Sequence, residues 1–395
     1  MPRKKTKISQ NLGLQEVLLN NRVDDDIQKL LFPMDLIQRL LLIPKYKIRD
    51  NFITPNGLWA NIINIFFTCI VTMIFLYYTM YTKRIIDVAD VEYVQTCLWL
   101  DFITYSMCVI INCLTCIFQS KNFVQLVLKI QESHRRLYSE KFQSFVKLNW
   151  VFFVILVIYQ IKEAIIIQAL YFRGNMIVTV MTQYLLSSID FNILIAIRWM
   201  QFINLKFEVW LKEFRLYTNI KESSYGRLKT EQIWKRMYHM YSCITKCYNL
   251  FKKSFQYVIM YHVAEMFIHT ACYVEMLIEF NKLASDRWTK TSHYLGVGVM
   301  MIWIVKKLTL HTLLAMALER FYMIQESVED ICSSVQARGA PDACKMMCKN
   351  IRRLNTSETD KFKPCLLFLM DAKFPLRLLS LITTYIIVLL QFAYL

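Results

Sequence analysis

The sequence predicts an all-α membrane protein with seven transmembrane helices, because long apolar stretches are frequent and helix-breaking residues are scarce. Hydrophobic residues make up 56% of the 395 residues, whereas Gly and Pro number only 7 each. This composition disfavours disordered chains and turn-rich β proteins. A net charge of +17 would suggest nucleic acid as the partner of a soluble protein. In a chain this apolar we expect membrane lipids as partners instead, and no nucleic acid.

Seven apolar stretches are each long enough to cross the hydrocarbon core, which takes about 18 residues in a helix. They comprise residues 57–81, 97–118, 149–171, 177–203, 256–280, 294–318 and 376–395. No polar linker separates them into soluble blocks, so we expect a single membrane domain. The sequence therefore predicts a multi-pass protein of the cell (plasma) membrane.

The distribution of Lys and Arg predicts the orientation of these spans, because cytoplasmic loops retain basic residues. With a cytoplasmic N-terminus, the inside segments hold about 36 Lys and Arg and the outside loops about 6. The reverse orientation would place most of the basic charge outside. Seven spans that start inside leave the C-terminus extracellular, which is opposite to the orientation of a G-protein-coupled receptor.

This topology divides the chain into four parts. They are a cytoplasmic N-terminal segment (1–56), spans one to six (57–318) with cytoplasmic helical extensions at 119–148 and 204–255, a cytoplasmic segment (319–375) and span seven (376–395). Within the first part, residues 27–43 have the apolar spacing of an amphipathic helix. We expect the helical extensions to pack together or against neighbouring subunits.

Signatures of enzymes and metal sites are missing from the sequence. There is no G-x-S-x-G, no H-E-x-x-H and no glycine-rich phosphate or dinucleotide loop, and 7 glycines could hardly supply such loops. Cys113 and Cys116 form a C-x-x-C inside an apolar span, where packing between helices explains them better than a metal. We expect no catalytic residues, no cofactor and no metal.

Aromatic and hydrogen-bonding side chains gather toward the outer ends of spans two to five. Such side chains are what an extracellular pocket for a small molecule requires. Because Tyr and Trp also form belts at both membrane surfaces, each aromatic residue has the alternative role of an interfacial anchor. The predicted ligand-binding residues are Trp99, Asp101, Tyr105, Gln168, Tyr171, Thr182, Gln183, Tyr273 and Glu275.

Charged groups deeper in the spans have a different interpretation, because an unpaired charge is costly in lipid. We expect these groups to form structural ion pairs or to extend their charge toward the cytoplasmic surface. They are Lys162, Asp190, Arg198, Lys306 and Lys307.

The last apolar stretch has two distinct helical faces. Residues seven apart return to nearly the same side of a helix, so Thr384 lies above Gln391, and Tyr385 lies above Phe392. One face offers a hydroxyl and an amide separated by aliphatic side chains, and the other is bulky and suited to packing. Repeated by rotational symmetry, the first face could line a cation pore whose aliphatic ring gates by dewetting. In a lone span, Gln391 would simply hydrogen-bond to a neighbouring helix.

Thr384-Tyr385, five apolar residues and then Gln391-Phe392 match the T-Y-x5-Q-F signature that ends the seventh helix of insect gustatory receptors. The chain resembles this family in its length, its seven spans and its inward N-terminus as well. The resemblance implies a tastant-gated, nonselective cation channel, built as a homotetramer or as a heterotetramer with related receptors. The helical extensions would form a cytoplasmic anchor domain that holds the subunits together.

The resemblance also implies roles for individual residues. Span seven would be the pore helix, and Tyr385 would pack it against its neighbours. The tastant pocket would lie among the outer halves of spans two to six, where the polar residues were found independently. The residues of the pore and gate would be Thr384, Ile387, Val388, Gln391 and Phe392.

Other functions stay open at this point. Insect odorant receptors share the fold and the inverted topology but need a separate co-receptor. A secondary transporter would show internal repeats and helices interrupted by Gly or Pro, and neither is apparent in the sequence. The pocket residues fit a sugar as well as a bitter plant compound, and the latter is favoured only because no feature of sugar receptors stands out.

Overall fold

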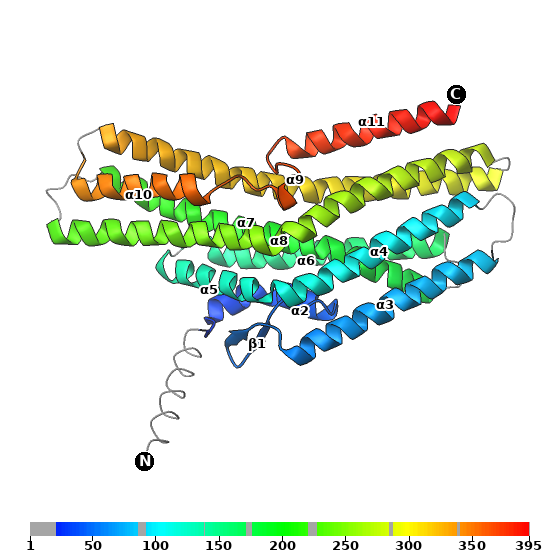
Figure 1. Ribbon diagram of the computed structural model, residues 1–395, viewed down its shortest axis with the longest axis horizontal. Helices are drawn as coiled ribbons and strands as arrows, with labels where there is room; N and C mark the ends of the chain where they lie inside the picture. The colour runs from blue at the N-terminus through cyan, green and yellow to red at the C-terminus, as the bar shows by residue number, and fades with distance from the viewer. Residues whose placement is uncertain are drawn as a thin grey trace, which may run out of the picture.

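The computed structural model describes residues 21–85, 92–137, 139–170, 176–219, 227–283, 287–337 and 340–394. Long helices dominate these residues and lie side by side in one elongated bundle (Figure 1). The prediction of an all-α membrane protein is confirmed. The elements follow in the order α2 (Asp25–Leu40), β1 (Lys47–Arg49), β2 (Phe52–Thr54), α3 (Leu58–Ile85), α4 (Glu92–Phe118), α5 (Ser120–Arg136), α6 (Phe142–Leu170), α7 (Met176–Asn219), α8 (Arg227–Leu283), α9 (Arg287–Ala337), α10 (Asp342–Glu358), the 3-10 helix η2 (Pro364–Leu366) and α11 (Phe374–Tyr394).

Six helices in the described part of the chain are long and apolar enough to cross a membrane. Their apolar stretches are Leu58–Tyr77, Trp99–Phe118, Phe142–Ile166, Gln183–Thr218, Val297–Ala337 and Phe374–Phe392. The predicted span at residues 256–280 is helical within α8 but does not belong to this set. It carries His262, Glu265 and His269, which make it more polar than the other spans. The seventh crossing, the orientation and the four-part division of the chain therefore stay predictions.

A short β-hairpin, which the sequence pattern did not indicate, fixes the N-terminal segment to the bundle. β1 and β2 pair antiparallel with Arg49 opposite Phe52. Asp50 and Asn51 form the turn with φ angles of 52° and 66°, a left-handed conformation that Asp and Asn tolerate better than most residues. The carbonyl of Asn51 accepts a hydrogen bond from the backbone nitrogen of Val23 at 2.7 Å, so the turn holds the residues that lead into α2.

Helices α7, α8 and α9 form the centre of the bundle, and α7 is enclosed along its most apolar part. Of the 18 consecutive residues in its most apolar part, 94% are buried, against 22% of the corresponding 18 residues of α11. α10 packs across α8 and α9 at the end of the bundle away from the C-terminus (Figure 1). The core between these helices is strongly aromatic. Its largest buried side chains include Trp199, Trp210, Phe214, Tyr241 and Tyr248.

Helix α11 lies at the edge of the bundle, where it contacts α8 and α9 along one side (Figure 1). Leu376 is 70% exposed at its start and Phe392 is 81% exposed near its end. Between them, Leu381 and Ile387 are 56% and 51% exposed. Most of the surface of α11 is therefore available to lipid or to other copies of the chain.

Candidate functional site

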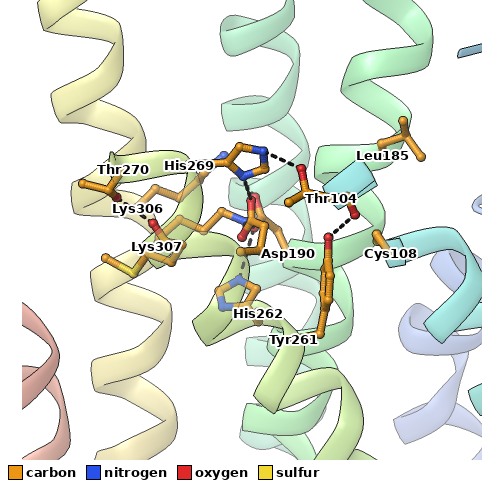
Figure 2. A network of polar contacts seen from close by, with 12 residues as sticks. Thr104, Cys108, Leu185, Asp190, Tyr261, His262, His269, Thr270, Lys306 and Lys307 are labelled. Atoms are coloured by element: carbon orange, nitrogen blue, oxygen red, sulfur yellow. Dashed lines mark hydrogen bonds and ion pairs between the residues drawn. The ribbon is translucent and has the colours of Figure 1, made fainter. Parts of the chain in front are cut away.

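Ionisable side chains meet inside the bundle, where apolar packing would be the default (Figure 2). They come from five different helices, namely α4, α6, α7, α8 and α9. Asp190 of α7 and Lys307 of α9 are both 0% exposed. Because an isolated charge is costly in a membrane, such groups need partners and mark a functional or structural centre.

Two adjacent lysines of α9 bridge three carboxylates. Lys306 Nζ lies 2.6 Å from Glu163 Oε2 and 3.0 Å from Asp190 Oδ2. Lys307 Nζ lies 2.9 Å from Asp190 Oδ1 and 2.9 Å from Glu265 Oε2. Since each ammonium group joins two acids, the five residues form a continuous row of alternating charges across four helices. The expectation that Asp190, Lys306 and Lys307 form ion pairs is confirmed.

His269 extends this row to α4. Its Nδ1 lies 3.2 Å from the Oε1 of Glu265, one helical turn earlier on α8. Its Nε2 lies 3.2 Å from Asp101 Oδ1 and 3.0 Å from the hydroxyl of Thr104, so both ring nitrogens have partners. Figure 2 shows the ring between Thr104 and the deeper charges. We refer to the complete row as the charge ladder, which consists of Glu163, Lys306, Asp190, Lys307, Glu265, His269 and Asp101.

A branch of polar and aromatic contacts leads from Asp190 toward α11. His262 Nε2 lies 3.5 Å from Asp190 Oδ1. The Nδ1 of the same ring lies 2.9 Å from the Nε2 of His311 on α9. The ring of His311 meets that of Phe374, the first residue of α11, with centroids 6.0 Å apart. The charge ladder is thus connected to the beginning of the last helix.

Aromatic rings surround His269 at the end of the ladder that includes Asp101. Tyr105 and Tyr273 stack against the imidazole with centroid distances of 5.0 Å and 5.5 Å. Trp303 meets it edge-on at 6.0 Å. The side chain of Asp101 is 24% exposed, whereas that of His269 is 0% exposed. Asp101 is therefore the member of the ladder that a small molecule can reach most directly.

Four of the nine predicted ligand-binding residues are connected to the charge ladder, at two different places. Asp101, Tyr105 and Tyr273 come together around His269, although they lie far apart in the sequence. Gln183 lies on a separate branch, where its amide nitrogen donates to Gln160. Gln160 in turn donates to Asp190 Oδ2 at 2.9 Å.

The other predicted pocket residues are not part of this cluster as it is described. Trp99 packs edge-on against Phe102 with centroids 5.8 Å apart. Gln168 is half-buried in α6, and Glu275 is exposed on α8. Tyr171 lies outside the described residues. The side chain of Thr182 lies outside them as well.

Two central members of the site were not among the predicted binding residues: His269, which belongs to the polar side chains near the outer end of span five, and Trp303. Helical spacing carries the signal that could have identified them. His269 lies four residues after Glu265 and four before Tyr273, so these three share one face of α8. Trp303 lies four residues before Lys307 on α9. A search for polar and aromatic residues in phase within each span would have selected both.

The residues predicted for the pore and gate follow one another along α11. All of Thr384, Ile387, Val388, Gln391 and Phe392 are exposed in a single copy of the chain. Tyr385, predicted to pack, is 40% exposed. Its ring contacts that of Phe267 on α8 at 5.5 Å.

The arrangement is suited to transmitting a displacement between helices. Each interior member of the charge ladder is shared by two partners, so moving one group changes the balance of forces on the next. Asp101 and Glu265 sit on two different helices but bind the same imidazole. Among the described residues, no three His, Cys, Asp or Glu side chains are placed to hold a metal ion.

A comparison with protein-family models identifies a family to which the sequence is similar. The family model described as 7tm chemosensory receptor matches residues 41–395. The matched range includes every helix from α3 to α11, and therefore the whole charge ladder and the proposed pore helix. A search of curated proteins finds no significant match.

Proposed function

The chain belongs to the 7tm chemosensory receptor family, and from this membership we propose that it is a gustatory receptor that works as a tastant-gated, nonselective cation channel. The family places the protein at the cell membrane as a multi-pass chemoreceptor. The T-Y-x5-Q-F signature in α11 supports the gustatory assignment within that family. In this proposal a small molecule binds near Asp101, and cations permeate along the face of α11 that includes Gln391.

The observation that carries the proposal is that α8 contacts both the charge ladder and the proposed pore helix at nearly the same level. On one side of α8, His269 contacts Asp101 and Glu265 of the charge ladder. Phe267, two residues earlier, contacts Tyr385 of α11. A ligand held at Asp101 and Tyr273 would move α8, and Phe267 would pass this movement to α11. The ligand opens the channel only if it binds the open state more tightly than the closed state.

The exposure of α11 supports an oligomeric pore. Thr384 and Gln391 are polar and exposed, although they lie in a helix apolar enough to cross the membrane. The Thr384 hydroxyl donates to the backbone carbonyl of Ser380, so the exposed amide of Gln391 has the greater need of water. Polar groups facing lipid are unfavourable, whereas a water-filled channel would hydrate them. Four copies arranged around one axis, identical or related, would bring these faces together. Ile387 and Val388 would then form the aliphatic constriction between the two polar levels.

The cytoplasmic anchor of such an assembly would be built from α10 and the extended parts of α7, α8 and α9. α10 packs against α8 and α9 through one apolar face. The buried residues of that face are Cys344, Met347, Cys348 and Ile351. Because the same long helices continue into the bundle that holds the charge ladder, the anchor would fix the subunits while the outer parts move.

Electrical recording in oocytes tests the proposal. The full-length chain is expressed alone, tastants are applied, and current is measured while G-protein signalling is blocked. A current that persists under the block supports an intrinsic channel. Complete loss of the current under the block would exclude it.

The same recordings separate a gustatory receptor from an odorant receptor subunit. The family match does not distinguish the two, so the chain is expressed alone and together with an odorant co-receptor. We expect tastant-evoked current from the chain alone. Current that depends entirely on the co-receptor would assign the chain to the odorant group.

A further inference from the structure

A groove of about 440 Å³ lies between α6, α7 and α9, well away from the aromatic cluster at His269. Its lining is basic on balance. Lys141, Arg198 and Arg320 contribute three positive charges, and Glu208 contributes one negative charge. Arg320 Nε donates to the Glu208 carboxylate, which leaves Lys141 and Arg198 as the basic groups of the lining without a carboxylate partner among the described residues.

Arg198 is the unusual member of this lining, because it is buried without an acidic partner. Only 3% of it is exposed, and no carboxylate within the described residues lies at ion-pair distance from its guanidinium. It donates instead to the side chains of Asn149 and Gln201 and to the backbone carbonyl of Phe145. Its guanidinium carbon Cζ also lies 4.1 Å from the ring centroid of Phe145, over the face of the ring. Neutral acceptors and a ring face compensate a buried cation less completely than a negative charge does.

The groove lies at the cytoplasmic boundary of the membrane that the sequence predicts. Its lining residues lie where three predicted spans, 149–171, 177–203 and 294–318, reach their cytoplasmic ends. Exposed apolar residues line the same groove, with Leu148 47% exposed and Met316 60% exposed. Basic groups beside exposed apolar side chains at this depth are suited to a molecule with an anionic head and an apolar tail.

A hydrogen-bond acceptor in the groove indicates which kind of head fits. Asn204 is 3% exposed and donates its amide nitrogen to the carbonyl of Ala317 at 2.6 Å. Its Oδ1 accepts no hydrogen bond within the described part of the chain. A buried carbonyl oxygen of this kind is stabilised by an O–H or N–H donor, which neither a phosphodiester nor an acyl chain supplies.

We propose that this groove binds an anionic phospholipid whose headgroup carries hydroxyl groups, as in phosphatidylinositol. The phosphate lies between Lys141 and Arg198, a hydroxyl donates to Asn204, and the acyl chains run along Leu148 and Met316. This lipid site is separate from the proposed tastant pocket. Its occupancy does not depend on which tastant the receptor binds. Because α7 and α9 also carry the charge ladder, a lipid held here would bias the packing of the same helices.

Native mass spectrometry of the purified full-length chain tests the proposal by counting bound lipids during titration. We expect phosphatidylinositol to bind at least ten-fold more tightly than phosphatidylcholine. Lys141→Gln should weaken phosphatidylinositol binding roughly five-fold, which corresponds to about 1 kcal/mol for one basic residue near an anionic surface. Arg198→Gln should remove the preference over phosphatidylcholine, provided that the variant keeps its thermal stability.

Lys147→Gln is the matched control, because Lys147 is exposed on α6, which begins directly after Lys141, but does not line the groove. Unchanged binding in this variant supports a defined site. An equal loss in Lys147→Gln and Lys141→Gln would overturn the proposal in favour of diffuse surface charge. Equal binding of phosphatidylinositol and phosphatidylcholine would overturn it as well.

Two further titrations distinguish the source of the anion. Displacement of the lipid by inositol 1-phosphate alone would assign the groove to a soluble anion and overturn the lipid assignment. Phosphatidic acid carries the phosphate without the inositol hydroxyls. Binding of phosphatidic acid as tight as that of phosphatidylinositol would overturn the role given to Asn204.

Discussion

The aromatic ring of Phe267 on α8 lies 5.5 Å from that of Tyr385 on α11, measured between centroids. If this contact transmits ligand binding to the pore, Tyr385→Ala should lower the tastant-evoked current relative to the amount of protein at the surface. Aromatic pairs contribute about 0.5–1.5 kcal/mol, so we expect a loss of roughly 2- to 12-fold. Tyr385→Phe keeps the ring and should retain the current. Equal currents from the Ala and Phe variants would remove this contact from the gating pathway.

Gln391 is expected to contribute to the gate, because it is the last polar residue on the exposed face of α11 whose side chain the structure describes. Gln391→Ala should change cation permeability ratios or basal leak while surface expression stays intact. Reversal potentials in solutions of different cations measure the effect. Leu376→Ala, at the exposed start of the same helix, serves as the control. Unaltered conduction in Gln391→Ala would place the gate elsewhere.

Asp101 should be more important for ligand sensitivity than Glu275, although both were predicted to bind ligand. Asp101 lies 3.2 Å from the His269 imidazole, whereas Glu275 is exposed on α8. In the proposed pocket the Asp101 carboxylate binds the tastant directly. A hydrogen bond to a charged group contributes about 1.5–3 kcal/mol, so Asp101→Asn should raise the half-maximal tastant concentration at least about ten-fold. Glu275→Gln should leave it unchanged. Dose–response curves that shift equally for both variants would contradict the cluster at His269 as the pocket.

Removing a charge from the middle of the ladder should destabilise the protein severely. Lys307→Met leaves Asp190 and Glu265 without a shared ammonium group, and breaking a buried pair costs about 3–5 kcal/mol. Thermal unfolding of the purified protein and surface expression measure the loss. Lys162→Met, at an exposed position of α6, should have no effect.

A double variant tests whether the loss in Lys307→Met arises from the unpaired acid. Combining it with Glu265→Leu removes one of the two carboxylates that lost their partner. The double variant should be more stable than the sum of the two single changes predicts. Strict additivity would show that the two groups do not stabilise one another.

Acid should destabilise the packing of α5 through His134. Burial, together with the positive charge of Lys206, lowers the pKa of His134 from its ordinary value of 6.5 to about 4. Because the folded protein favours the neutral ring, this contribution to stability is complete above pH 6.5 and is lost as the pH falls through 4. Asp26, 4.0 Å away, opposes the shift only in part.

Thermal unfolding between pH 7 and pH 5 measures this dependence. His134→Phe keeps a ring against Phe142, whose centroid lies 4.4 Å from the imidazole, and should reduce the acid sensitivity. His239→Phe, at a position where the side chain is 50% exposed, should keep it. The same sensitivity in both variants would assign the effect to other groups.

Much of the helical architecture could be predicted from the apolar pattern. The stretch at 376–395 corresponds to α11 at Phe374–Tyr394, and the stretch at 97–118 ends with α4 at Phe118. The hairpin escaped prediction because β1 and β2 have three residues each, too few to show an alternating pattern. Helix α10 was not predicted as a separate helix within the segment 319–375. The four-residue spacing of Cys344 and Cys348, which share one of its faces, is a sign of that helix.

The sequence allowed the presence of buried charged groups to be predicted, but not which acid pairs with which base. A charge in lipid must be paired or must reach a polar surface, so the depth of Asp190, Lys306 and Lys307 predicted one of these two arrangements, and the structure shows ion pairs. Which acid meets which lysine depends on how α6, α7, α8 and α9 are placed against one another, and no local pattern specifies that. His269 has its role only because Asp101 of α4 and Glu265 of its own helix reach the same ring.

The charge ladder has a consequence for how the protein is made. On entering the bilayer alone, residues 256–280 would expose Glu265 to lipid, and the hydrocarbon core would reject a lone carboxylate there. Lys307 supplies the opposite charge from α9, the helix that follows next along the chain. The two helices are therefore expected to leave the translocation channel as a pair, with the salt bridge formed during insertion. Substitutions at Lys307 would then be seen as a failure of biogenesis before any effect on sensing could be measured.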